Sequence, residues 1–380
     1  MERRHFLQAG FATAALATLP RRFAADSRAA DPLAELFNVR ASDDGPLRLN
    51  SNENPLGIAS SARRAVIEKL VDANRYPGAE KRALVRRIAA MHGVRPENIV
   101  MGNGSTEVLQ MMVQALAAPG TRLVIPDPTF EQVEGYAKPF NLDLVKVPLT
   151  SAYVHDLARM EAAAREGRGA VLVYVCSPNN PTASITPTAA VDAWIQRAPD
   201  NVWFLVDEAY IHFVDASGYE SALKWIGKKP NVVVARTFSK IYGMAGMRLG
   251  YGVAHPDTIR KLDAFAADSN TNILALAAAD ATLDDQPYLR QARQANDEAR
   301  RILCDALEEM GITYIPSQAN FVMYQVGDTK AFQKRMRDRD IWVGRPFPPM
   351  LEYNRTSIGT PEQMGRFVEV LKDFRTRSWV

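Results

Sequence analysis

The sequence predicts an α/β fold, a three-layer sandwich around a mostly parallel seven-stranded sheet, followed by a smaller α+β domain at the C-terminal end. Seven short runs rich in β-branched and apolar residues recur along the chain, and several are apolar throughout. Continuously apolar strands are typical of parallel sheets that helices cover on both faces. A length of 380 residues also suffices for one large core and a smaller companion domain.

The elements follow one another in the order that such a fold requires. The predicted strands are residues 98–101, 122–125, 142–147, 170–176, 202–206, 232–235 and 249–253. Helices predicted at residues 106–117, 187–197 and 221–226 supply the covering layers. From about residue 286 the pattern changes to a long charged helix, residues 287–310, and then to short strands alternating with helices at 329–339 and 361–377. This change indicates the smaller α+β domain.

These patterns divide the chain into four parts. Residues 1–28 form a leader and residues 29–60 an N-terminal arm, in which the density of Asn, Pro and Gly is typical of irregular structure. Residues 61–284 form the large domain and residues 285–380 the small C-terminal domain.

The net charge of +3 is confined to the leader. Residues 1–28 contain five arginines and two acidic residues, which accounts for the whole excess. The rest of the chain is neutral, so the composition does not indicate a nucleic-acid partner.

The leader resembles a twin-arginine export signal. Arg3 and Arg4 are followed by Phe6, Leu7 and an Ala-rich apolar run over residues 9–20. That run is too short and too weakly hydrophobic for a stable membrane span. We therefore expect the twin-arginine export machinery as a partner and a periplasmic location. The alternative is a basic N-terminal helix, but the paired arginines, the Phe-Leu pair and the apolar run occur in the order of a signal.

The cysteine content indicates that the fold depends on its core. Cys176 and Cys304 lie far apart, in a predicted strand and a predicted helix, and we expect both to be free thiols. The sequence has no Cys/His cluster with metal-ligand spacing, so no metal site is predicted.

A lysine follows the strand at residues 232–235. Ligands of open α/β sheets bind at the carboxyl ends of the strands, and lysine is the residue that forms Schiff bases. Thr237 and Ser239 flank Lys240, and with Arg248 they could hold a phosphate dianion. Taken alone, Lys240 could equally be an exposed loop residue.

Asp207 ends another strand, after an apolar run with no other charge. A carboxylate buried there could pair with the protonated ring nitrogen of a pyridine cofactor, and Tyr210 could reach the phenolic oxygen of that ring. The alternative is an aspartate that caps the following helix.

Two further strand ends carry polar groups. The irregular segment 177–182 directs Asn180 toward the crevice. Gly104, Ser105 and Thr106 open a helix, whose amides and hydroxyls form an anion site. The full G-x-G-x-x-G spacing is absent, which argues against a dinucleotide fold.

Together these segments resemble fold-type I pyridoxal-phosphate enzymes, and most closely the histidinol-phosphate aminotransferase branch. The resemblance runs from about residue 49 to residue 371. It is carried, in order, by residues 49–57, 75–77, 102–106, 177–182, 207–210, 239–240 with Arg248, 319–321 and 355–359.

The resemblance implies pyridoxal 5'-phosphate as the cofactor, with Lys240 as the Schiff-base lysine and Asp207 as the partner of the pyridine nitrogen. Asn180 and Tyr210 contact the phenolic oxygen, and Phe130 stacks on the ring. Ser105, Thr237, Ser239 and Arg248 fall on phosphate-binding positions, and Gly104 and Thr106 of the anion site at the helix start are further cofactor-binding residues. Tyr76 corresponds to a residue that reaches the cofactor phosphate of a neighbouring subunit, which implies a homodimer with shared sites.

The resemblance also places Arg355 at the substrate anion, beside Asn180, and a planar guanidinium suits a carboxylate. A surface salt bridge is the alternative interpretation of Arg355. Arg345 is a second candidate anion contact.

Some residues depart from the family pattern. Ala183 stands where glycine is usual, the arm before Leu49 has no Tyr-x-Pro element, and residues 345–349 are unlike those of histidinol-phosphate enzymes. We therefore expect transamination between an amino acid and a 2-oxo acid rather than a reaction of histidinol phosphate. Decarboxylation, as in the related threonine-phosphate decarboxylases, and non-catalytic ligand binding are the alternatives.

Overall fold

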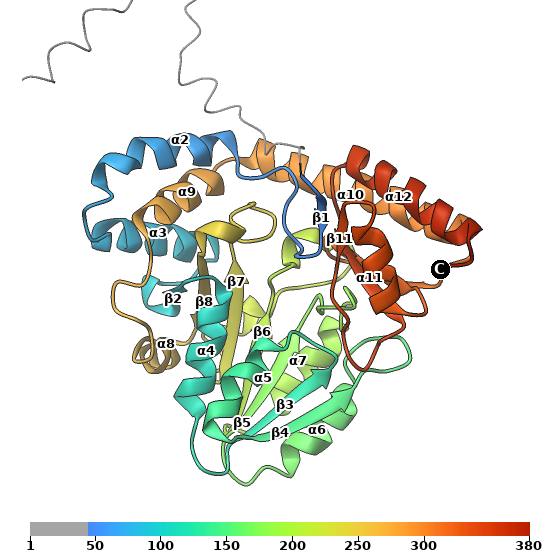
Figure 1. The fold of residues 1–380 in the computed structure, drawn as a ribbon. Coiled ribbons are helices and arrows are strands. Elements are labelled where there is room, and N and C mark those ends of the chain that lie inside the picture. Colours follow the sequence, from blue (N-terminus) through green and yellow to red (C-terminus); the bar gives the residue numbers. More distant parts are fainter. Residues whose placement is uncertain (1–44) are drawn as a thin grey trace, which may run out of the picture. The chain divides into compact units, whose positions relative to one another are not determined.

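The structure is a computed structural model that describes residues 45–380, and a seven-stranded sheet lies at its centre (Figure 1). The strand order is β2-β8-β7-β6-β5-β3-β4. Six strands run in the same direction, and β8 alone runs opposite to them. The strands are β2 (Ile99–Gly102), β3 (Arg122–Asp127), β4 (Asp143–Pro148), β5 (Val171–Cys176), β6 (Val202–Asp207), β7 (Val232–Thr237) and β8 (Gly250–Ala254). All seven predicted strands are confirmed, each within two residues at either end.

Helices cover both faces of this sheet, which confirms the three-layer sandwich. Every residue of β5 is buried. Leu172 and Tyr174 pack in one apolar cluster with side chains of α4 (Ser105–Leu116), α5 (Gln132–Ala137) and α8 (Pro256–Asp263). Val171 and Val173 pack in another, with α6 (Leu157–Arg165) and α7 (Thr188–Arg197). Successive strand residues thus point to opposite helical layers.

One predicted helix is wrong. Residues 221–226 form only a short 3-10 helix, η5 (Ala222–Trp225). The Ser221 hydroxyl accepts a hydrogen bond from the Leu223 amide at its start, and Gly227 follows its end at φ +86°. The intervening stretch therefore forms a single 3-10 turn, from which Ala222 is still buried against the sheet.

Six α-helices of the described residues were not predicted from the sequence patterns: α5, α6 and α8, named above, and three more that pack in one apolar cluster with side chains of β2 and β8. These three are α2 (Ser60–Lys69), α3 (Gly78–Met91) and α9 (Ile273–Leu283), with the 3-10 helix η1 (Leu70–Asp72) after α2. Their buried side chains share a cluster with Met101, Phe238 and Tyr251. The other short 3-10 helices are η2 (Pro96–Asn98), η3 (Lys138–Phe140), η4 (Ile211–Phe213) and η6 (Ala245–Met247).

The C-terminal part contains the predicted long helix and a separate small sheet. Helix α10 (Gln286–Glu309) begins and ends within one residue of its prediction. This small sheet is antiparallel and has the strand order β12-β10-β9. Its strands are β9 (Tyr314–Ile315), β10 (Phe321–Gln325) and β12 (Tyr353–Ser357). Helices α11 (Thr329–Arg337) and α12 (Pro361–Thr376) complete this α+β region.

The arm contributes a strand to the C-terminal part. Strand β1 (Leu47–Leu49) pairs in parallel with β11 (Ile341–Val343), and the two lie side by side in Figure 1. Leu47 and Leu49 are buried in the same cluster as the core side chains of α10, α11 and α12. This pairing brings the segment after Leu49 to the carboxyl edge of the large sheet. The four-part division of the chain stays a prediction.

The predicted export signal lies outside the described residues, as do residues 29–44 of the predicted arm. Within residues 45–380, no helix is long and apolar enough to cross a membrane. Cys176 and Cys304 are both free thiols, as predicted.

Candidate active site

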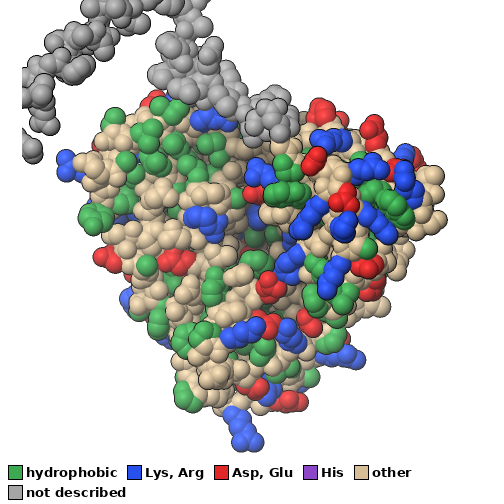
Figure 2. All heavy atoms as spheres, viewed as in Figure 1, with side chains coloured by type: hydrophobic (Ala, Val, Ile, Leu, Met, Phe, Trp, Pro, Cys, Tyr) green, Lys and Arg blue, Asp and Glu red, His purple; other side chains and the backbone are tan. Residues whose placement is uncertain are grey.

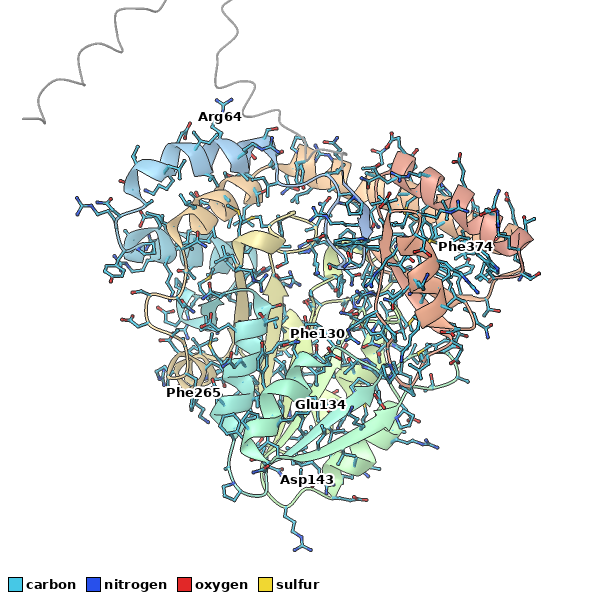
Figure 3. The ribbon with its side chains drawn as sticks, viewed as in Figure 1. Arg64, Phe130, Glu134, Asp143, Phe265 and Phe374 are labelled. Carbon is cyan, nitrogen blue, oxygen red and sulfur yellow. The ribbon has the colours of Figure 1, made fainter. Side chains whose placement is uncertain are left out.

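A cleft of about 560 Å³ lies where the large sheet, the arm and the C-terminal part meet. The ends of β5, β6 and β7 and the start of α4 open into it. Phe130, labelled in Figure 3, follows the end of β3 and lines the cleft. The other predicted residues that line it are Ser105, Thr106, Asn180, Asp207, Tyr210, Thr237, Ser239, Lys240, Arg248, Arg345 and Arg355. Gly104 lies directly beside it, whereas Tyr76 is 89% exposed and is not among the lining residues.

Lys240 is half-buried in this cleft, three residues after the end of β7. Its Nζ donates a hydrogen bond of 3.2 Å to the Asn52 carbonyl and lies 5.4 Å from the centre of the Tyr210 ring. Burial, assisted by the nearby Arg355 charge, lowers the pKa of Lys240 to about 8. The amine therefore becomes a neutral nucleophile more readily than an exposed loop lysine would.

Asp207 is buried at the end of β6, with 3% of its surface exposed. Its Oδ2 accepts a hydrogen bond of 2.9 Å from the Tyr174 hydroxyl, and its Oδ1 accepts one of 3.1 Å from the Ala209 amide. Burial raises the pKa of this carboxyl to about 6, although the Tyr174 hydrogen bond opposes the rise. Asp207 does not cap an α-helix, because the next element is the 3-10 helix η4, which Tyr210 precedes.

Arg355 and Asn180 meet in the cleft. Arg355, on β12, donates a hydrogen bond of 2.7 Å from Nη1 to Asn180 Oδ1 and one of 2.8 Å from Nη2 to the Asn50 carbonyl. Only 7% of the arginine is exposed, and its Nε has no partner within residues 45–380. Burial lowers the pKa of Arg355 to about 10, so the guanidinium stays charged at neutral pH.

The surface salt-bridge interpretation of Arg355 is therefore wrong. No carboxylate of the described residues forms an ion pair with it. Both guanidiniums instead contact the Phe347 ring, whose centre lies 4.6 Å from Arg355 and 4.3 Å from Arg345. Arg345 is exposed and forms an ion pair of 2.7 Å with Glu131. A buried cation without a carboxylate partner is suited to an anionic ligand.

The phosphate-binding positions surround the Arg248 guanidinium. It donates hydrogen bonds of 3.3 Å to Thr106 Oγ1 and 3.4 Å to Ser239 Oγ. Gly104 has φ +78° at the start of α4, and a Cβ there would overlap this guanidinium. A helix N-terminus, two hydroxyls and a guanidinium thus form a cradle that a phosphate dianion fits.

Sequence reasoning did not identify several residues of the site. Asn52 adopts φ +53° and is buried, and its Nδ2 donates a hydrogen bond of 3.1 Å to the Tyr210 hydroxyl. An asparagine in the Asn-rich arm was the available signal, since Asn tolerates left-handed backbone. Tyr174 was the only polar side chain in its predicted strand apart from the terminal cysteine, and buried tyrosines usually have a hydrogen-bond partner. Gln333 and Arg337 of α11 also line the cleft, without an evident sequence signal.

Comparisons with known proteins agree with this geometry. The sequence model of the family Aminotransferase class I and II matches residues 44–371. Histidinol-phosphate aminotransferase of Moorella thermoacetica is 36% identical over 332 residues, which cover 86% of this chain and 85% of that protein. The enzyme of the same name from Symbiobacterium thermophilum is 38% identical over 330 residues, with coverages of 86% and 90%.

The similarity extends to a solved structure that contains the cofactor. Histidinol-phosphate aminotransferase from Sinorhizobium meliloti, in complex with pyridoxal-5'-phosphate, superimposes with a TM-score of 0.82 at 27% identity. The match covers 94% of this chain and all of that chain. Transamination fits these relatives better than decarboxylation or non-catalytic binding. The chain therefore belongs to the class I and II aminotransferases, and it is a pyridoxal-phosphate-dependent enzyme of that family.

Proposed function

We propose that this enzyme moves an amino group between an amino acid and a 2-oxo acid, with Lys240 as the residue that carries the cofactor. The observation that carries the proposal is the buried Arg355, which has no carboxylate partner among residues 45–380 and opens into the same cleft as Lys240. A substrate carboxylate would supply that missing partner.

When bound, pyridoxal phosphate supplies a ring that accepts electrons from the substrate. Asp207 would hold the proton at the pyridine nitrogen, because a carboxylate stabilises a neighbouring cation. Lys240, with its lowered pKa, would carry a proton from the substrate Cα to the C4′ atom of the cofactor. Arg248, Ser105, Thr106, Thr237 and Ser239 would hold the phosphate. Phe130 would cover one face of the ring, and Asn180 and Tyr210 would contact its phenolic oxygen.

Arg355 favours a carboxylate because its planar fork can donate two parallel hydrogen bonds. Arg345 is the candidate for a second anionic group of the substrate, although a ligand would have to compete there with Glu131. The missing Tyr-x-Pro element and the altered segment 345–349 further favour an amino acid.

Histidinol phosphate is the second candidate substrate. The names of relatives 36% and 38% identical to this chain favour it. A phosphate monoester is also an anion that guanidiniums bind, so Arg355 and Arg345 are compatible with it.

One panel of substrates tests the proposal. The purified protein, loaded with pyridoxal phosphate, is incubated with each amino acid or with histidinol phosphate, together with 2-oxoglutarate. Keto-acid formation and release of carbon dioxide are measured in parallel. Keto acid from an amino acid supports the proposal. Turnover of histidinol phosphate alone supports the second candidate, and carbon dioxide release without keto acid contradicts both.

We also propose a homodimer with shared active sites. Tyr76 is 89% exposed and Val71, close in sequence, is 82% exposed, while Figure 2 shows hydrophobic side chains gathered over α2. Sedimentation should give about twice the monomer mass. Tyr76→Ala should weaken cofactor binding, whereas Phe140→Ala, at another exposed aromatic, should not. A monomeric active enzyme would contradict the proposal.

A periplasmic location is the last part of the proposal. It rests on the order of Arg3, Arg4, the Phe-Leu pair and the apolar run in the leader. Export through the twin-arginine machinery would carry the chain already folded around its cofactor.

A further inference from the structure

The carboxylate at the floor of the cleft has a hydroxyl donor behind it. Tyr174 is fully buried in β5, and its hydroxyl donates a hydrogen bond of 2.9 Å to Asp207 Oδ2. The two strands are parallel neighbours in which Cys176 is paired with Asp207. Tyr174 lies two residues earlier and hence on the same face as Cys176, so its ring reaches diagonally to the end of β6.

We propose that Tyr174 is a positioning residue for the cofactor, which keeps Asp207 ionised and oriented toward the pyridine nitrogen. This inference rests on the proposed role of Asp207 as the partner of that nitrogen. Tyr174 itself is absent from the residues that line the cleft, so it would act only through the carboxylate.

The direction of the hydrogen bond is fixed by the surroundings of the phenol. Burial, together with the adjacent Asp207 carboxylate, raises the pKa of Tyr174 well above its ordinary value. The phenol therefore stays protonated, and it can only donate to an ionised carboxylate. The same hydrogen bond opposes the rise that burial imposes on the pKa of Asp207.

The other ionisable groups around Asp207 do not replace this donor. Lys240 lowers the carboxyl pKa through its charge, but it would lose its ammonium form on binding the cofactor. Glu208 raises the Asp207 pKa, although it is itself paired with Arg236 at 2.7 Å. Burial raises the pKa of the Cys176 thiol, which therefore stays neutral. With the cofactor in place, Tyr174 and the Ala209 amide remain as the hydrogen-bond donors to the carboxylate within residues 45–380.

Removing the hydroxyl should make Asp207 easier to protonate. A hydrogen bond to a charged group corresponds to a factor of about ten or more in an ionisation constant. Asp207 loses its negative charge as the pH falls through its pKa. Cofactor binding should therefore weaken below about pH 6 in the wild type. In Tyr174→Phe the pH below which binding weakens should be about one unit higher.

The test is the dissociation constant of pyridoxal phosphate for the apoprotein, measured by equilibrium dialysis between pH 5.5 and pH 8.5. Tyr324→Phe is the matched control, because Tyr324 is also fully buried, and its hydroxyl pairs with Thr356 at 2.8 Å on the C-terminal sheet. The control should follow the wild-type curve. A Tyr174→Phe curve that superimposes on the wild-type curve would overturn the inference, as would an equal shift in the control.

A double-mutant cycle separates this inference from the proposed function. In the Asp207→Asn background there is no carboxylate to titrate, so Tyr174→Phe should change the dissociation constant less than about threefold. A tenfold effect in that background would mean that Tyr174 acts independently of Asp207, and the inference would fail. If Asp207→Asn alone altered neither cofactor affinity nor turnover, the proposed role of Asp207 would fail instead.

Discussion

Arg355 Nη1 donates a hydrogen bond of 2.7 Å to Asn180 Oδ1, and this contact joins the C-terminal sheet to the loop after β5 of the large sheet. The two residues are 175 positions apart in the sequence. The cleft that both residues line is therefore complete only when both sheets are folded and correctly placed. A substrate carboxylate at Arg355 would lie beside Asn180, one of the predicted contacts of the cofactor ring.

Arg355→Lys should raise the Michaelis constant for amino acids and lower turnover, because lysine keeps the charge but loses the planar fork. We expect kcat/KM to fall by more than about tenfold. If Arg355 formed only a salt bridge at the rim of the cleft, the change would be less than about 1 kcal/mol, or under about tenfold. Arg339→Lys is a suitable control, because Arg339 forms an exposed ion pair with Asp373. Equal wild-type activity on an amino acid and on its decarboxylated amine would show that Arg355 does not recognise a carboxylate.

Asp207→Asn should reduce turnover by about a hundredfold or more while the cofactor still binds. The substitution keeps the shape of the side chain and removes the charge that would stabilise a protonated pyridine nitrogen, and one desolvated charge pair contributes a few kcal/mol. Steady-state kinetics and the absorbance of the bound cofactor measure the two effects separately. An unchanged rate would mean that the ring does not need this proton.

The functional residues at the ends of the strands could be predicted from the sequence, because the position of each depends on a local pattern. A buried apolar strand followed by Lys240, Asp207 or Asn180 places that side chain at the carboxyl edge of the sheet. Tyr174 and Asn52 could not be assigned a role in this way. Their contacts with Asp207 and Tyr210 depend on strand order and on the path of the arm, which no local pattern reports. Helix α9 was missed for a related reason, since its Ala-rich sequence is apolar on all sides and has no amphipathic period.

Glu208→Ala should lower the free energy of unfolding by about 3–5 kcal/mol, because it leaves the buried Arg236 guanidinium without its carboxylate partner and with the Ser221 hydroxyl as an uncharged one. Arg236 is 8% exposed and Glu208 is 2% exposed, and they form an ion pair of 2.7 Å. Urea denaturation measures the change. The control is Glu309→Ala at the exposed pair with Lys372, which should cost less than about 1 kcal/mol. Similar losses of unfolding free energy in both variants would refute the claim that burial makes the Glu208–Arg236 pair important for stability.

Arg3→Lys combined with Arg4→Lys should block export, because the paired arginines are the feature that the proposed machinery would recognise. Arg21→Lys with Arg22→Lys preserves the same charges outside that motif and should leave export intact. Cell fractionation followed by immunoblotting locates each variant. Wild-type protein found full-length in the cytoplasm alone would contradict the periplasmic proposal and leave the enzymatic one intact.

The assignment of Lys240 as the cofactor-carrying residue is tested most directly by borohydride reduction of the purified holoenzyme, followed by peptide mass mapping. Its amine lies in the cleft with a pKa lowered to about 8, beside the cradle formed by Arg248, Ser239 and Thr106. We predict that reduction fixes the cofactor to the peptide containing Lys240, and that Lys240→Ala shows neither this adduct nor turnover. A reducible adduct and full turnover in Lys240→Ala would contradict the assignment.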